Sequence, residues 1–194
     1  MRQITTGNLI VRHGRWGCTL HTGVTLWFTG LSGSGKTTLC RCLNQRLQQM
    51  NVRTELLDGD VLRNQLFRGL GFSKEDRSLN VRTAAYMAQL LTRNDIIVLA
   101  SFISPYRDMR AQIRQSIQPF VEIYVKCSFG ECARRDVKGL YRKALSGEIP
   151  HFTGLTAPYE APLQPELIVD TEQHSEDQST ELILAYLKKH RYIY

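Results

Sequence analysis

One glycine-rich segment combines residue types that could hold phosphate groups. It reads Gly30-Leu-Ser-Gly-Ser-Gly-Lys-Thr37 and lies between an apolar run and a stretch with helical spacing. This is the P-loop pattern GxxxxGK[ST], in which glycines let backbone N–H groups face phosphate oxygens while the next helix presents its positive end. Lys36 is expected to reach the β- and γ-phosphates, and Thr37 to hold Mg²⁺ through its hydroxyl. The motif predicts an ATP site formed by Gly30, Leu31, Ser32, Gly33, Ser34, Gly35, Lys36, Thr37 and Thr38.

A pair of carboxylates flanks a glycine at Asp58-Gly59-Asp60, directly after a second apolar run. The third run ends in Ala100-Ser101, where many P-loop ATPases carry the Mg²⁺-binding aspartate, so the carboxylate has to come from Asp58 or Asp60. At the end of a strand beside the P-loop strand, one carboxylate could order metal-bound water while the other approaches an acceptor hydroxyl. The alternative is an Asp-Gly turn with a helix cap at Asp60.

A second group of residues could bind a ligand that carries an anionic group and a nucleobase. Singly, an arginine on a helix usually faces solvent and a phenylalanine usually lies in the core. Together they indicate an acceptor site, for which the candidates are Arg63, Phe72, Arg77, Asn80, Ile103 and Ser104.

Five short apolar runs predict the strands that position these motifs, at residues 24–29, 54–57, 96–101, 120–125 and 167–169. The segments between them have helical spacing. Their predicted buried faces contain Leu39, Leu43, Leu47 and Met50, then Leu79, Tyr86 and Leu90, then Leu182, Ala185 and Tyr186. The alternation predicts an α/β fold, a P-loop three-layer sandwich with a five-stranded parallel sheet and helices on both faces. Ligands of such a sheet bind beyond the carboxyl ends of its strands.

Length and composition favour one domain without a membrane segment. The 194 residues carry a net charge of +7, which suits polyanionic partners, and nucleotides meet that need as well as nucleic acid does. No stretch approaches the roughly 20 apolar residues of a membrane span and no secretory signal is visible, so we expect a cytoplasmic protein. Five cysteines without a CxxC pair are expected to be reduced thiols. Residues 1–22 are expected to form an irregular extension, and residues 23–194 a single kinase domain with a mobile lid at about 136–165.

Several further blocks occur in one order after the P-loop. They are Asp58-Gly-Asp-Val-Leu-Arg63, Gly71-Phe-Ser-Lys-Glu-Asp-Arg-Ser-Leu-Asn80, Ile103-Ser-Pro-Tyr-Arg107, Lys138-Gly-Leu-Tyr141 and Phe152-Thr-Gly-Leu-Thr-Ala-Pro-Tyr-Glu160. From about residue 23 to residue 170 the chain closely resembles the adenylylsulfate kinase (APS kinase) family. The resemblance implies transfer of the γ-phosphoryl group of ATP to the 3′-hydroxyl of adenosine 5′-phosphosulfate, giving PAPS and ADP in sulfate assimilation. It also implies a homodimer. We expect no nucleic-acid partner, because the chain has no recognisable nucleic-acid-binding module, and no membrane partner, because it has no apolar span.

The resemblance implies roles for single residues on the acceptor side. Arg63, Arg77 and Asn80 would contact the phosphosulfate and adenosine of the acceptor. Its adenine would stack between Phe72 and Phe152, which suits two flat aromatic faces.

The resemblance implies three further residues near the transferring phosphate. Lys138, in the lid, would approach it, and Asp60 would be the catalytic carboxylate. Ser104 matches a serine proposed in some members as a phosphorylated intermediate. We favour direct in-line transfer, because positioning and charge neutralisation account for most phosphoryl-transfer catalysis, so that Ser104 contacts substrate. Mg²⁺ would be held by Thr37, Asp58 and Asp60.

The chain departs from the family pattern at a few positions. Leu145 and Pro150 stand where members tend to carry basic residues, so this lid has less positive charge. In plant members a cysteine resembling Cys42 takes part in a regulatory disulfide, but no cysteine stands where its N-terminal partner would lie, and Cys18 is the candidate substitute.

Two other interpretations stay open at this stage. Another small-molecule P-loop kinase, of the nucleoside-monophosphate or gluconate type, would share the cradle and the lid. A non-catalytic ATP-binding module is disfavoured by Lys36, Asp60 and the lid lysine. A GTPase or a transport ATPase is disfavoured because the chain has neither an Asn-Lys-x-Asp nor a Leu-Ser-Gly-Gly sequence.

Overall fold

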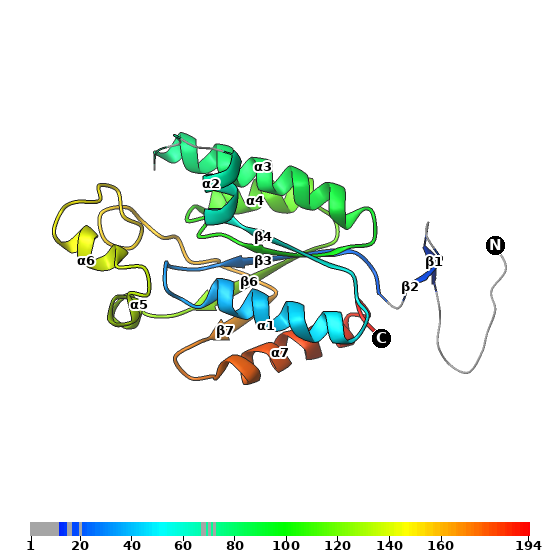
Figure 1. The fold of residues 1–194 in the computed structure, drawn as a ribbon. Helices are drawn as coiled ribbons and strands as arrows, with labels where there is room; N and C mark the ends of the chain where they lie inside the picture. The colour runs from blue at the N-terminus through cyan, green and yellow to red at the C-terminus, as the bar shows by residue number, and fades with distance from the viewer. Residues whose placement is uncertain (1–11, 15–16, 20, 67–68, 70, 72) are drawn as a thin grey trace.

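A five-stranded parallel sheet forms the centre of the protein (Figure 1). The computed structural model describes residues 12–14, 17–19, 21–66, 69, 71 and 73–194. The strands are β3 (Val24–Thr29), β4 (Thr54–Asp58), β5 (Ile97–Ser101), β6 (Phe120–Lys126) and β7 (Leu167–Asp170), in the spatial order β4-β5-β3-β6-β7. All neighbouring pairs are parallel, so the predicted sheet is confirmed. Every residue of β3 and β5 is buried, which explains their unbroken apolar runs.

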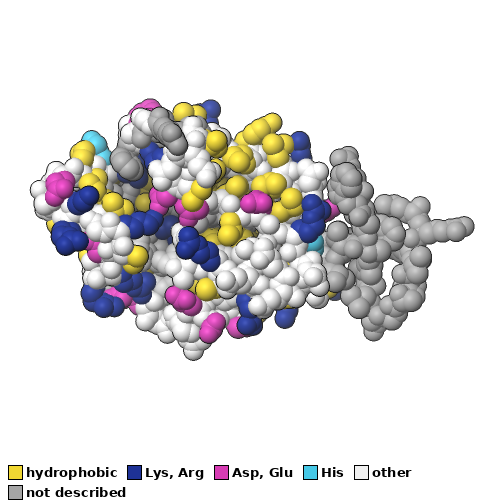
Figure 2. All heavy atoms as spheres, viewed as in Figure 1, with side chains coloured by type: hydrophobic (Ala, Val, Ile, Leu, Met, Phe, Trp, Pro, Cys, Tyr) yellow, Lys and Arg dark blue, Asp and Glu magenta, His cyan; other side chains and the backbone are white. Residues whose placement is uncertain are grey.

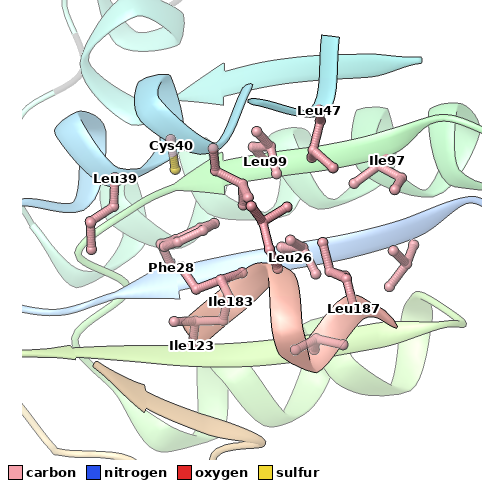
Figure 3. Close-up of a cluster of buried hydrophobic side chains, with 14 of the residues drawn as sticks. Leu26, Phe28, Leu39, Cys40, Leu47, Ile97, Leu99, Ile123, Ile183 and Leu187 are labelled. Carbon is pink, nitrogen blue, oxygen red and sulfur yellow. The ribbon is translucent and has the colours of Figure 1, made fainter. Parts of the chain in front are cut away.

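Helices cover both faces of the sheet, which completes the predicted three layers (Figure 1). On one face lie α1 (Lys36–Gln49) and α7 (Glu176–Lys189), and on the other lie α3 (Lys74–Thr92) and α4 (Arg107–Ser116). Figure 3 shows the hydrophobic core between the sheet and the helices α1 and α7. Leu39 and Leu47 of α1 and Ile183 of α7 pack there against Leu26 and Phe28 of β3. The short helix α2 (Gly59–Leu66) follows β4 directly.

The predicted faces of α3 and α7 are only partly right, whereas the leucines of α1 are buried as predicted. Tyr186 of α7 does pack against the core. Leu79 and Tyr86 of α3 are 44% and 61% exposed, and Leu182 of α7 is 39% exposed. The buried residues are instead Val81, Ala84, Ala85 and Ala88 in α3, and Ile183, Leu184 and Leu187 in α7. Alanines let α3 lie close to the sheet, and a search for large apolar residues at helical spacing overlooks them.

The segment between β6 and β7 carries two short helices and its own small core. The helices are α5 (Phe129–Arg135), which ends just before the predicted lid, and α6 (Leu140–Leu145), which lies within it. Tyr141 and Phe152 are buried there in a cluster that also includes Leu31 of the P-loop. The lid core is therefore built partly on the phosphate-binding loop.

The N-terminal extension differs from the irregular segment that the sequence predicts. Its described residues include two short antiparallel strands, β1 (Arg12–Gly14) and β2 (Gly17–Thr19). Within the described parts of the chain, no helix is long and apolar enough to cross a membrane.

Candidate active site

The P-loop joins β3 to α1 and leaves the start of that helix open. Gly33 and Gly35 have φ angles of 75° and 95°, in the left-handed region that favours glycine. Gly35 is the N-cap residue of α1, and no side chain caps the helix. The first N–H groups of α1 thus have no side-chain acceptor and can bind a phosphate.

Lys36 is folded back over this loop. Its Nζ donates to the carbonyl oxygens of Gly30 at 3.0 Å and Leu31 at 2.6 Å. The side chain is only 8% exposed. Burial lowers the pKa of Lys36 to about 8, although nearby Cys132 and Asp60 favour the charged form. The negative charge of a bound triphosphate would stabilise the protonated form of this side chain.

Thr37 and Asp58 meet at the carboxyl edge of the sheet. The hydroxyl of Thr37 donates to Oδ2 of Asp58 at 2.8 Å and lies 3.2 Å from Oγ of Ser101. The sequence places β4 beside the P-loop strand, and this is wrong, because β5 lies between β4 and β3. The contact is made because α1 reaches across β5. A hydroxyl and a carboxylate are the hard oxygen ligands that Mg²⁺ prefers.

The two aspartates around Gly59 have different partners. Oδ1 of Asp58 accepts from the backbone N–H groups of Asp60 at 2.9 Å and Val61 at 3.3 Å, so Asp58 and not Asp60 caps α2. The carboxylate of Asp60 forms an ion pair with Lys138 of the lid and is largely exposed. Two predicted catalytic groups from opposite sides of the site therefore meet.

A cavity of about 1000 Å³ connects the P-loop with the predicted acceptor side. From the P-loop it is lined by Lys36, Thr37 and Thr38, together with Ser32, Gly33 and Gly35. From the acceptor side it is lined by Arg63, Arg77, Asn80, Ile103, Ser104 and Phe152, and also by Asp58, Asp60 and Lys138. Of the predicted ATP residues, Gly30, Leu31 and Ser34 do not line this cavity. Figure 2 shows basic side chains gathered over α5 and α6, at the lid end of the molecule.

Arginines on the acceptor side connect neighbouring segments. Arg77 of α3 donates to Oγ1 of Thr153 at 2.7 Å and to the carbonyl of His151 at 2.8 Å, both in the lid. Burial lowers the pKa of Arg77. Arg63 of α2 donates to the carbonyl of Gly71. These contacts fix the guanidinium groups around the cavity before any anion binds.

Asn80 has a buried oxygen without a partner. It is 5% exposed, and its Oδ1 has no hydrogen-bond partner among the described residues, while its Nδ2 lies 3.4 Å from the carbonyl of Gly59. An unpaired buried acceptor next to a cavity suits a ligand that donates a hydrogen bond. Phe152 packs edge-on against Tyr141, with ring centroids 4.9 Å apart. Phe72, its predicted stacking partner, lies outside the described residues.

Ser104 occupies a strained position at the floor of the cavity. Its φ angle is 39°, which is unfavourable for a residue with a Cβ atom. The side chain is 2% exposed, and its Oγ accepts a hydrogen bond from Nε1 of Trp27 at 3.1 Å. The neighbouring carbonyl of Ile103 accepts from Thr29 Oγ1 at 2.7 Å.

Several residues that line the cavity escaped the sequence analysis. Arg135, Thr171 and His174 lie on its P-loop side. Arg135 donates through Nη2 to the carbonyl of Thr171 at 2.8 Å, and Thr171 donates to the carbonyl of Ser34 at 3.0 Å. Tyr141 donates to the carbonyl of Ser32 at 2.7 Å and so joins the lid to the P-loop. Of these residues, only Arg135 could have been noticed in the sequence, because it stands next to Asp136 at the start of the lid.

Comparison with known proteins decides the family. The model of the adenylylsulphate kinase family matches residues 22–170. The chain belongs to the adenylylsulphate kinase family. The match spans the P-loop, the acceptor-side residues and the lid of this family member.

Individual relatives agree with this membership. The family member is 51% identical over 173 residues to the adenylyl-sulfate kinase of Picosynechococcus sp., which covers 89% of this chain and 98% of that protein. It is 48% identical over 175 residues to the adenylyl-sulfate kinase of Staphylococcus epidermidis, and the match covers 89% of this chain and 88% of that protein. A structure of the Mycobacterium tuberculosis APS kinase in complex with AMPPNP and APS superposes with a TM-score of 0.83 at 39% identity, covering 87% of this chain and 99% of that one.

Proposed function

We propose that this member of the family transfers the γ-phosphoryl group of ATP to the 3′-hydroxyl of adenosine 5′-phosphosulfate. The observation that carries the proposal is the shared cavity, which the P-loop and the acceptor-side arginines line together with Asp60 and Lys138. The relatives named as adenylyl-sulfate kinases support the choice of acceptor. The cytoplasmic location expected from the sequence stays a prediction.

The reaction needs one nucleophile, one leaving group and one proton acceptor. The 3′-oxygen of the acceptor attacks the γ-phosphorus as the bond to the bridging oxygen breaks, and ADP leaves. Asp60 takes the proton from the attacking hydroxyl. Lys36 follows the charge that moves onto the leaving oxygen, and Lys138 neutralises the transferring group. The ion pair of Asp60 with Lys138 must open for both roles.

Thr37 and Asp58 would hold Mg²⁺, since their oxygens already lie within hydrogen-bond distance of each other. When bound, Mg²⁺ neutralises charge on the β- and γ-phosphates. Asp60 is a further candidate ligand, next to Asp58 in the same turn.

A substrate panel tests the proposed function. ADP release is measured by a coupled assay with adenosine 5′-phosphosulfate, AMP or gluconate as acceptor, and the product is identified by mass spectrometry. We expect turnover and a singly phosphorylated product with adenosine 5′-phosphosulfate alone. Faster turnover with AMP or gluconate would reject the proposed acceptor. Absence of ADP release with every acceptor would indicate a non-catalytic ATP-binding module.

We expect Ser104→Ala to retain measurable activity. The buried hydroxyl already accepts a hydrogen bond from Trp27, and no histidine lies beside it in the sequence to act as a base. A covalent route needs that hydroxyl as the nucleophile, so the variant would then be inactive and the wild type would trap label from γ-labelled ATP without acceptor. A labelled enzyme that passes its phosphate to added acceptor at the rate of kcat would contradict direct transfer.

The depressed pKa of Lys36 predicts that ATP binding takes up a proton at alkaline pH. Bound phosphates favour the ammonium, whereas the empty site leaves it about 90% neutral at pH 9 if its pKa is about 8. ATP affinity should therefore fall as the pH rises above about 8. Calorimetry in buffers of different ionisation enthalpy should show close to one proton taken up at pH 9 and about a tenth at pH 7. Lys36→Arg is the control, because a guanidinium stays charged at both values. Equal heats in all buffers at pH 9 would contradict the prediction.

The proposed enzyme is a homodimer. An apolar patch on β4, α2 and α3 supports this, and Figure 2 shows hydrophobic side chains gathered over this region. The exposed residues of the patch are Leu56, Val61, Leu66, Leu79 and Tyr86. Patches of this kind usually mark interfaces between proteins.

Charge in the apolar patch is expected to separate the subunits. Tyr86 is the most exposed of these residues, at 61%, so Tyr86→Glu should shift the molar mass in light scattering from two chains to one. Tyr194→Glu is the matched control, since Tyr194 is also exposed but lies at the C-terminus. A wild type that is monomeric at all concentrations would reject the homodimer.

A further inference from the structure

Arg110 on α4 is a buried cation whose three donor nitrogens reach three different segments. It is 3% exposed. Its Nε donates to Oε1 of Glu122 on β6 at 2.7 Å, its Nη1 to the carbonyl oxygen of Ser104 at 2.6 Å, and its Nη2 to the carbonyl oxygen of Glu160 at 2.6 Å. Such a fork is rigid, and its bonds are stronger than those between neutral groups.

The first backbone contact holds a conformation that the chain does not favour. Ser104 is in the left-handed region, and such residues persist only where the surroundings determine them. Its two polar groups are held from opposite directions, the carbonyl by Arg110 and the hydroxyl by Trp27. The segment Ile103–Pro105, which we call the acceptor loop, lines the cavity on the acceptor side.

The second backbone contact fixes the place where the chain leaves the lid. The N–H of Glu160 donates to the carbonyl of Pro105 at 2.8 Å, and the carbonyl of Glu160 accepts from Arg110. The carboxylate of Glu160 accepts from the backbone N–H of Arg107 at 2.7 Å. The end of the lid and the acceptor loop are therefore joined, and Arg110 bonds to both.

The charge of Arg110 is compensated without any ligand. Glu122 is 7% exposed and also accepts from Arg114 at 3.2 Å, which in turn binds Glu166. Among the described residues, the hydrogen bonds of the Arg114 guanidinium go to these two carboxylates and not to the acceptor loop or the lid. Arg110 and Arg114 thus lie on the same helix and bind the same carboxylate, but Arg110 also bonds to the acceptor loop and to the end of the lid.

We propose that Arg110 is a positioning residue for the phosphoryl acceptor, which it serves by locking the acceptor loop to the end of the lid. This inference rests on the proposed function. Without the guanidinium fork, Ser104 can leave its left-handed conformation and Glu160 loses one of its ties to the loop. Acceptor binding must then restore that order, which weakens it. The P-loop makes none of these bonds, so ATP binding is unaffected.

The test compares Arg110→Lys with Arg114→Lys. A lysine keeps the positive charge beside Glu122, but a single ammonium cannot reproduce the three-way fork. For Arg110→Lys we expect KM for adenosine 5′-phosphosulfate to rise about 10-fold or more, which matches the loss of charged hydrogen bonds, with KM for ATP unchanged. For Arg114→Lys we expect both constants to stay within about 2-fold, although thermal stability falls.

A second measurement does not depend on turnover. Hydrogen exchange of peptides containing the Glu160 amide, followed by mass spectrometry without ligand, reports the bond to Pro105. Exchange should be faster in Arg110→Lys and unchanged in Arg114→Lys. Unchanged acceptor KM in Arg110→Lys, or equal losses for ATP and acceptor, would overturn the inference. If the wild type does not use this acceptor, the proposed function is wrong. If exchange at Glu160 is the same in Arg110→Lys as in the wild type, the positioning role of Arg110 is wrong. If Arg110→Lys does not fold, Arg110→Gln, which keeps two hydrogen-bonding groups, takes its place.

Discussion

Lys36→Ala is expected to lower kcat more than about 10²-fold, in line with the loss of single electrostatic contacts to a transition state. The side chain is buried in the P-loop and its ammonium is the group that can follow charge from the γ-phosphate to the leaving oxygen. Its ammonium donates to the carbonyls of Gly30 and Leu31, so it lies in the cradle.

The control for Lys36 is another lysine near the cavity. Lys143 of α6 is exposed and does not line the cavity, so Lys143→Ala should keep near-normal kcat. The coupled ADP assay gives kcat, and calorimetry with a non-hydrolysable ATP analogue separates binding from chemistry. A Lys36→Ala enzyme with near-normal kcat would remove the P-loop assignment.

Asp60→Asn is expected to lower kcat by about 10²–10³-fold, the range of a general base. An amide keeps the shape and the possibility of a hydrogen bond but cannot accept the proton of the 3′-hydroxyl at neutral pH. Glu55→Gln is the matched control, since Glu55 is an exposed carboxylate on β4 that does not line the cavity. Single-turnover measurements with saturating ATP and acceptor give the rate of the chemical step.

The ion pair between Asp60 and Lys138 offers a second explanation that must be separated from base catalysis. If Asp60 mattered only because it positions Lys138, Asp60→Asn would add nothing to the loss caused by Lys138→Met. If Asp60 is the base, the double variant should be slower than either single variant, because each group then contributes on its own. Full activity of Asp60→Asn would instead show that the acceptor hydroxyl needs no general base at this position.

The sequence predicts the structure best where a feature depends only on residues that are close together in the chain. The P-loop needs glycines at left-handed positions, and Gly33 and Gly35 have them. The strands β3 and β5 are buried along their whole length and leave apolar runs in the sequence, whereas β4 and β6 each contain a glutamate, Glu55 and Glu122. The leucines of α1 repeat at the spacing of one helix face and are buried. The order of the motifs along the chain was enough to indicate the family.

Only the tertiary structure decided which residues meet across the sheet. The order of the strands places β5 between β4 and β3, yet Thr37 still reaches Asp58, and no local pattern contains this distance. Half of the buried residues of α3 are alanines, which let the helix lie close to the sheet, while Leu79 and Tyr86 are exposed. Arg110 looks like an ordinary surface arginine in the sequence. Its bond to Ser104 spans six residues and its bond to Glu160 spans 50. Its burial and the meeting of these segments are set by packing of the whole domain.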